Sequence, residues 1–189
     1  MLKAIDVDRN SKLISGVLDV WTTVLPPYER IPAEVVLRLI ELHDYVTLSA
    51  YLDETADESP ENVLGMSYVI DTPGLPFAYL LYLGVRPEAQ GKGVGSEILD
   101  IIKARTGQPL LLDVEPIDDP DAENKQQRQD RWRFYQRNGF EKTDLIICYK
   151  EEVFQVLVSG FDVTADQVDA LCEEKAALFY DPCIEDAWE

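Results

Sequence analysis

The pattern of apolar and polar positions along the chain predicts interleaved strands and helices. An apolar run over residues 77–85, rich in Tyr and Leu, shows neither helical spacing nor alternation, which is typical of a buried strand. The next segment has the helical period and a stop at Gly107. Its apolar positions are Val94, Ile98, Ile101 and Ile102. Between the strand and the helix lies a turn with three glycines in residues 91–95.

The rest of the chain continues this alternation. Further strands are predicted at residues 1–7, 46–53, 63–72, 109–114, 140–152 and 153–159. Further helices are predicted after a cap at Asn10 or Ser11, from Pro32 onwards, and over residues 124–138. A last helix begins at a capping box formed by Thr164 and Gln167. The acidic segments 54–62 and 117–123 are predicted to be loops.

The glycine-rich turn has the chemistry of an anion site. The first N–H groups of a helix lack internal partners and carry the positive end of the helix dipole. Glycine lets the backbone adopt positive φ and approach a bulky phosphate closely, and Lys92 adds a positive charge. The expected ligand is a phosphate or pyrophosphate, and the alternative is a glycine-rich turn without a ligand.

The spacing of the glycines selects among phosphate-binding motifs. Neither G-x-G-x-x-G nor the P-loop pattern fits, whereas Gln90, Gly93 and Gly95 match Q-x-x-G-x-G. In this turn the chain resembles the GNAT superfamily of acetyl-CoA-dependent N-acetyltransferases. A second stretch, residues 131–140, is similar to that family's F-Y-x-x-x-G-F helix and places Tyr135 at its Tyr.

The resemblance implies an α/β (α+β) fold over residues 1–159, in the order β-α-α-β-β-β-α-β-α-β-β. It implies a mixed, mostly antiparallel sheet of about six to seven strands, with helices on both faces and splayed central strands. We therefore expect a GNAT domain at residues 1–160. Residues 161–189 are expected to be a helical appendage, packed on the same domain or at a dimer interface.

The resemblance also implies a site for acetyl-CoA as co-substrate and needs no metal. Backbone amides of the turn would hold the pyrophosphate, and the preceding strand would hold the pantetheine arm. The implied residues are Leu83, Val85, Gln90, Gly91, Lys92, Gly93, Val94, Gly95 and Ser96. Tyr135 would protonate the leaving thiolate; alternatively, it is a core aromatic residue with a bonded hydroxyl.

The general base is less clearly marked. Leu81 stands where many family members have Glu, and Arg128 stands where many have Asn. The nearest candidates are Asp113 and Glu115, which are alternatively exposed acids that end a strand. The single histidine, His43, supports no nucleophile scheme, so direct transfer is favoured. Tyr28, Glu29 and the acids at 53–61 are candidates for shaping the acceptor pocket.

The net charge of the protein limits the classes of partner that it can bind. The 189 residues carry a formal net charge of -19, which repels nucleic acid and anionic membranes. This charge indicates either a solvated acidic surface or a cationic acceptor. There is no apolar run of about 18 residues, and the N-terminus is charged, so a cytoplasmic protein is expected. The three cysteines are expected to be reduced, two of them as packing residues.

Two hypotheses follow. The first is an N-acetyltransferase acting on a primary amine, a small cationic molecule rather than a protein or peptide. The second is a non-catalytic acyl-CoA-binding module with a regulatory role, supported by Leu81 and by the extra C-terminal helix. A homodimer is possible in either case.

Overall fold

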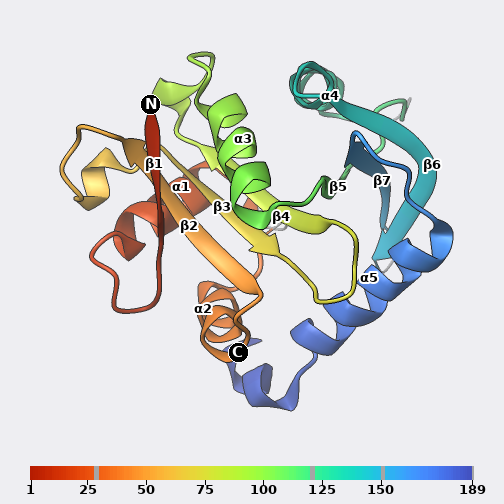
Figure 1. The fold of residues 1–189 in the computed structure, drawn as a ribbon, viewed down its shortest axis with the longest axis horizontal. Coiled ribbons are helices and arrows are strands. Elements are labelled where there is room, and N and C mark those ends of the chain that lie inside the picture. The colour runs from red at the N-terminus through yellow and green to blue at the C-terminus, as the bar shows by residue number, and fades with distance from the viewer. Residues whose placement is uncertain (28–29, 120–121, 150–151, 189) are drawn as a thin grey trace.

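A computed structural model describes residues 1–27, 30–119, 122–149 and 152–188. Its strands form one seven-stranded sheet in the order β1-β2-β3-β4-β5-β7-β6 (Figure 1). Neighbouring strands are antiparallel except β4 and β5, which are parallel. The strands are β1 (Leu2–Asp6), β2 (Val46–Asp53), β3 (Gly65–Ile70), β4 (Ala78–Val85), β5 (Leu110–Val114), β6 (Phe140–Tyr149) and β7 (Glu152–Ser159). The predicted mixed, mostly antiparallel sheet is confirmed.

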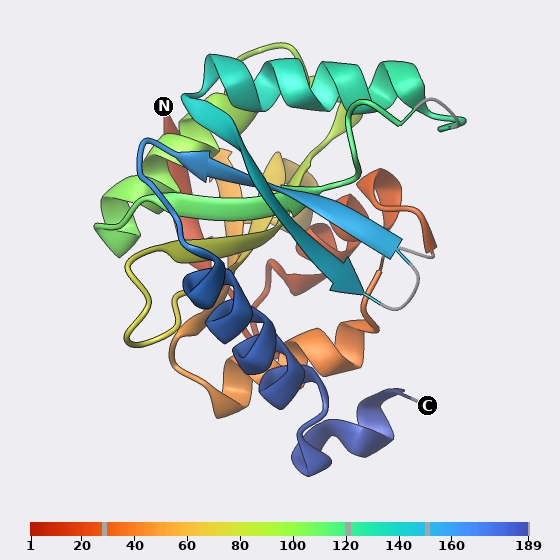
Figure 2. The same ribbon diagram turned by 90° about the vertical axis from the view of Figure 1, so that its right-hand side faces the viewer.

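Helices cover both faces of the sheet, as predicted. They are α1 (Ile14–Val24), α2 (Ala33–Leu42), α3 (Val94–Thr106), α4 (Lys125–Arg137) and α5 (Ala165–Phe179). One core cluster, which defines the first face, contains buried residues of α1, α2 and α5. The other cluster, on the second face, contains buried residues of α3 and α4. In Figure 2, α4 and α5 lie at opposite ends of the view, with β6 and β7 between them.

The central strands diverge, as the predicted fold requires. β4 pairs with β5 only at Ala78↔Leu110 and Tyr79↔Leu111. The ladder between β3 and β4 shifts register after Val69↔Leu80, which leaves Leu81 without a partner on β3. Such a bulge inserts one extra residue and bends its strand. Leu81 and Tyr82 accordingly both pack against the first face, and beyond them β4 runs on without β5 beside it.

Local signals set most helix ends. In the predicted capping box of α5, the Thr164 hydroxyl accepts from the Gln167 N–H at 3.3 Å, and the Gln167 Oε1 accepts from the Thr164 N–H at 3.0 Å. The predicted cap of α1 is wrong, because Leu13 occupies that position and caps with no side chain. The Ser11 carbonyl accepts from the Ile14 N–H, so the chain makes a separate turn before the helix begins.

The cysteines differ from expectation. All three thiols are free, but Cys148 and Cys183 are exposed and only Cys172 is half-buried. The prediction of two packing cysteines is therefore wrong. The neighbour Ile147 packs into the first face, so Cys148 points to the opposite side of a strand at the sheet edge. Within the described ranges, no helix combines the length and apolar character needed to span a membrane.

Candidate functional site

The turn before α3 has the backbone of an anion-binding loop. Gly91 and Gly93 adopt φ of 73° and 86°, and a Cβ added at either would meet nothing within 4 Å. These glycines are therefore needed for backbone conformation and not for space. Gly93 is the N-cap of α3 and offers no side-chain cap, so the first N–H groups of this helix remain available to a ligand. Lys92 is exposed between the two glycines.

Gly95 has a different role in the same motif. A Cβ at this position would lie 3.0 Å from Cζ and 3.1 Å from Cε2 of Phe134 on α4. A Cβ would press against that ring, so glycine favours this close approach of the first turn of α3 to Phe134. The third glycine of the motif therefore joins the turn to the helix that carries Tyr135.

The end of β4 presents main-chain groups toward the gap between β4 and β5. The Arg86 N–H donates to the Leu64 carbonyl at 2.8 Å, and bonded pairs alternate along an antiparallel ladder. The N–H and C=O groups of Leu83 and Val85 therefore point away from β3, to the side from which β5 has diverged. The Gln90 amide donates to the Val85 carbonyl at 2.9 Å, so this side chain braces the turn against the strand.

Tyr135 lies on α4 at the second face and is 9% exposed. Its ring packs edge-on against Phe134 and Phe140, with centroids 5.1 and 5.3 Å away. Burial raises the pKa of this phenol to about 12, while the charge of Arg131 one turn earlier opposes the rise. No hydrogen bond among the described residues engages the hydroxyl, which leaves it available as a donor.

Asp113 lies on β5 with its carboxylate on the first face, in the alternation that also places Leu111 there. The Tyr79 hydroxyl donates to Asp113 Oδ1, and Lys175 Nζ lies 3.9 Å from the same oxygen. Lys175 also donates to the Tyr79 hydroxyl at 2.8 Å. Within the described part of the chain, no hydrogen bond occupies Oδ2. Asp113 is thus an anchored carboxylate with one open oxygen.

Glu115 is held differently. Arg128 contacts its Oε1 at 2.9 Å and Arg131 contacts its Oε2 at 3.2 Å. The Asn124 amide donates to both oxygens at 3.1 Å. Two cations and an amide therefore engage the whole carboxylate, which fastens the N-terminal half of α4 to the end of β5. To act as a base, Glu115 would have to break these contacts.

Other predicted positions lie elsewhere. Tyr28 and Glu29 fall outside the described residues. Among the acids at 53–61, Asp53 accepts from Thr55, and Glu58 lies 3.0 Å from Lys12 and 4.0 Å from Lys3. These contacts hold the acidic loop beside β1, at the sheet edge far in strand order from the diverging pair (Figure 1).

Sequence reasoning missed Tyr79 and Lys175. Tyr79 is 1% exposed, and its place in an apolar run concealed its polar contacts. Lys175 carried a readable signal, because it follows Leu171 by four residues and Cys172 by three, inside the apolar stripe of the last helix. A lysine in such a stripe needs a partner, and the sequence offered no means of choosing it.

Comparison with known proteins identifies the family. The protein-family model described as "Acetyltransferase (GNAT) domain" matches residues 47–142, just over half of the chain. The chain therefore belongs to the GNAT acetyltransferases, a family of acyltransferases. It is 36% identical over 70 residues to YjbC of Bacillus subtilis (strain 168), whose name assigns it to the acetyltransferases. That match covers 37% of this chain and only 34% of YjbC.

Solved structures confirm the fold. A GNAT-family protein from Bacteroides thetaiotaomicron aligns with TM-score 0.74 at 16% identity, covering 94% of this chain and 98% of that one. An aminoglycoside 6'-N-acetyltransferase complexed with coenzyme A aligns with TM-score 0.58 at 13% identity, over 83% and 96% of the two chains. The NatC complex bound to Gag peptide and CoA aligns with TM-score 0.58 at 14% identity, over 85% and 99%.

Proposed function

We propose that this protein transfers an acetyl group from acetyl-CoA directly to a primary amine. The observation that carries the proposal is the junction of three features at one place. These are the N-terminus of α3, which no side chain caps, the main-chain groups at the end of β4 that point away from β3, and the Tyr135 helix packed on Gly95. The membership of this chain in the GNAT acetyltransferase family supports the same chemistry.

The co-substrate would lie along these groups. Backbone amides of residues 91–96 would accept the pyrophosphate, helped by Lys92. The groups of Leu83 and Val85 that face the gap would bond the pantetheine arm. An amide near Val85 would then donate to the thioester oxygen as negative charge develops on it.

Acyl transfer exchanges one bond to the acetyl carbon for another and moves two protons. The unprotonated amine nitrogen attacks the thioester carbon, a C–N bond forms and the C–S bond breaks, and the thiolate leaves. Because burial raises the Tyr135 pKa to about 12, its hydroxyl stays protonated at neutral pH and donates to the leaving sulfur. The proton lost by the amine goes to a base.

Asp113 is the better candidate for that base. Its Oδ1 is held by Tyr79 and lies near Lys175, whereas both oxygens of Glu115 are bound by arginines. The open Oδ2 of Asp113 would take the proton. Glu115 would act instead by fixing Arg131 and the start of α4, one turn before Tyr135.

A small cationic amine is the proposed acceptor. A protein with net charge -19 attracts cations, and an aminoglycoside acetyltransferase shares the fold. The peptide-bound NatC complex shares it equally, so a peptide amine is the alternative acceptor. Residues 1–160 would form the catalytic domain, with 161–189 as its helical extension, in a cytoplasmic protein for which a homodimer is the proposed assembly.

One observation favours a second function, that of a non-catalytic acyl-CoA-binding module. Leu81 occupies the bulge of β4, where many family members carry a Glu, and its side chain packs against the first face of the sheet. The module would bind acetyl-CoA and need no Tyr135 hydroxyl.

The test is CoA thiol release from acetyl-CoA with polyamines, aminoglycosides, amino acids and peptides as acceptors. We expect release that requires an acceptor and falls about tenfold or more in Tyr135→Phe. Calorimetry of CoA binding by the same variant should be unchanged. Binding without release from any acceptor would support the module, and absence of CoA binding would contradict both functions.

A further inference from the structure

Three polar side chains from distant parts of the chain meet on the first face of the sheet. They are Tyr79 of β4, Asp113 of β5 and Lys175 of α5. Lys175 Nζ donates to the Tyr79 hydroxyl at 2.8 Å and lies 4.6 Å from the centre of that ring. Tyr79 donates in turn to Asp113 Oδ1. The side chains of Lys175 and Asp113 are only 19% and 12% exposed.

This cluster lies where the central strands begin to diverge. Tyr79↔Leu111 is the last paired position of β4 and β5, and Asp113 follows Leu111 by two residues on the same face. A cation, a phenol and a carboxylate therefore bridge β4, β5 and α5 at the closed end of the gap. Lys175 lies outside residues 47–142, which the family model matches, so this contact comes from the extension of the chain.

The energetics favour a role for the ammonium beyond filling space. A carboxylate with little solvent contact is costly unless a cation or hydrogen-bond donors compensate it. Both contacts use Oδ1, so they fix the rotation of the carboxylate and direct Oδ2 away from them. The cluster thus holds the Asp113 carboxylate in one orientation.

We propose that Lys175 is a positioning residue for acyl transfer, which holds Asp113 through Tyr79 so that Oδ2 faces the acceptor amine. This inference rests on the proposed function. The helix α5 is then part of the reacting unit. Titratable and charged groups that act on this cluster from the first face are Tyr82 of β4 and Asp169 and Cys172 of α5. Tyr135 of α4 acts on Asp113 from the second face, and Cys148 of β6 acts on Cys172 from the sheet edge.

The test compares Lys175→Met with the native protein across pH. Because the ammonium favours the ionised carboxylate, its loss should move the acid limb of kcat/KM to higher pH by about one unit or more. At neutral pH kcat/KM should fall about tenfold or more, while KM for acetyl-CoA stays unchanged. Lys175→Arg, which keeps the charge, should return the limb toward its native position.

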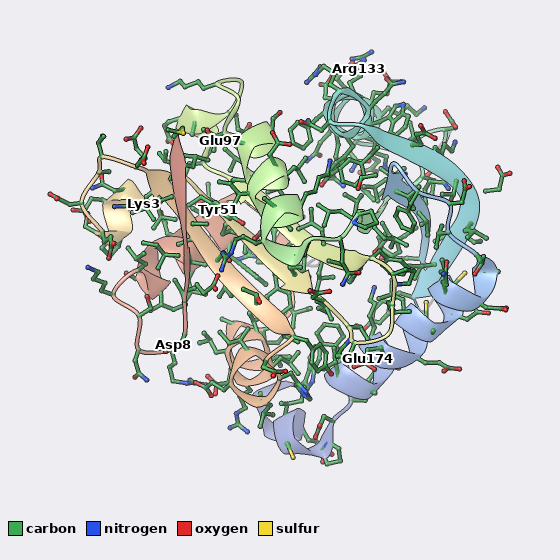
Figure 3. The ribbon with its side chains drawn as sticks, in the orientation of Figure 1. Lys3, Asp8, Tyr51, Glu97, Arg133 and Glu174 are labelled. Atoms are coloured by element: carbon green, nitrogen blue, oxygen red, sulfur yellow. The ribbon has the colours of Figure 1, made fainter. Side chains whose placement is uncertain are left out.

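Tyr45→Phe is the matched control. The Tyr45 hydroxyl donates to Glu174 at 2.6 Å, and Glu174, labelled in Figure 3, lies on the same helix one residue before Lys175. This variant loosens α5 without touching the cluster, so the limb should not move. If Lys175→Met does not fold, Tyr79→Phe removes the bridging hydroxyl, keeps the ring, and carries the same prediction.

A stability cycle provides a readout that needs no turnover. Lys175→Met leaves a largely buried carboxylate without its nearby cation, and Asp113→Asn in the same chain removes that negative charge. The double variant should therefore lose less stability than the two single variants lose together. An unmoved acid limb or additive losses, in a native protein that turns over, would overturn the role of Lys175 alone. A native protein without turnover would overturn the proposed function itself.

Discussion

Gly95 on α3 lies against the ring of Phe134 on α4, at a distance where a Cβ would come within 3.0 Å of Cζ. This contact couples the two halves of the candidate site, because Phe134 precedes Tyr135 and Gly95 ends the glycine turn. The glycine-rich turn and the helix that carries Tyr135 therefore cannot shift independently of each other.

Gly95→Ala should force these helices apart. We expect a loss of stability of about 1 to 3 kcal/mol from overpacking, measured by urea unfolding, together with weaker CoA binding. Adding Phe134→Leu should restore part of both quantities, because the shorter side chain makes room. No recovery in the double variant would contradict this account of the third glycine.

Gly93→Ala should affect the ligand more than the fold. The residue has φ of 86° with open space around its missing Cβ, so alanine costs about 1 to 2 kcal/mol in backbone strain. Gly74 is a matched control, with φ of 93° and similarly open space in the turn between β3 and β4. Both alanine variants should lose similar stability, but only Gly93→Ala should weaken CoA binding. If Gly93→Ala bound CoA as tightly as Gly74→Ala does, the turn would not be the phosphate site.

Glu115→Gln tests whether Glu115 acts as the catalytic base or holds α4 in place. Its partners Arg128 and Arg131 are only 14% and 29% exposed, so removing the charge should cost about 1 to 3 kcal/mol of stability. The exposed pair Lys142 and Asp118 is the control, where Asp118→Asn should change stability by less than about 1 kcal/mol. Loss of turnover in Glu115→Gln with unchanged melting temperature would instead identify Glu115 as the base.

Alkaline pH should unfold the protein through its buried phenols. Burial raises the pKa of Tyr45 and Tyr135 to about 12 and raises that of Tyr51. An unfolded tyrosine ionises near pH 10, so above that pH the unfolded chain has released protons that the folded chain retains. Stability is therefore full below about pH 10 and falls as pH rises toward 12. Tyrosinate absorbance should lag behind the titration of the denatured chain and rise with unfolding, and coincident curves would contradict this.

Much of the fold could be predicted from local patterns. The strand at residues 46–53 and the capping box at Thr164 agree with the structure, because alternation and capping depend only on neighbouring residues. The cap of α1 could not be predicted in the same way. A polar residue at Ser11 made a preceding turn in place of the helix start.

The sequence alone determined the order of the elements, the glycine turn at the N-terminus of a helix, and the helix that carries Tyr135. These follow from apolar period and glycine spacing, which act over a few residues. Only the tertiary structure showed that Asp113 and Glu115 have different surroundings. Asp113 lies on β5, Glu115 follows the end of that strand, and the two look alike in sequence. Yet Asp113 contacts a phenol and a lysine, and Glu115 contacts two arginines. Those partners come from segments far along the chain, and their contacts depend on how the sheet bends and where the helices pack.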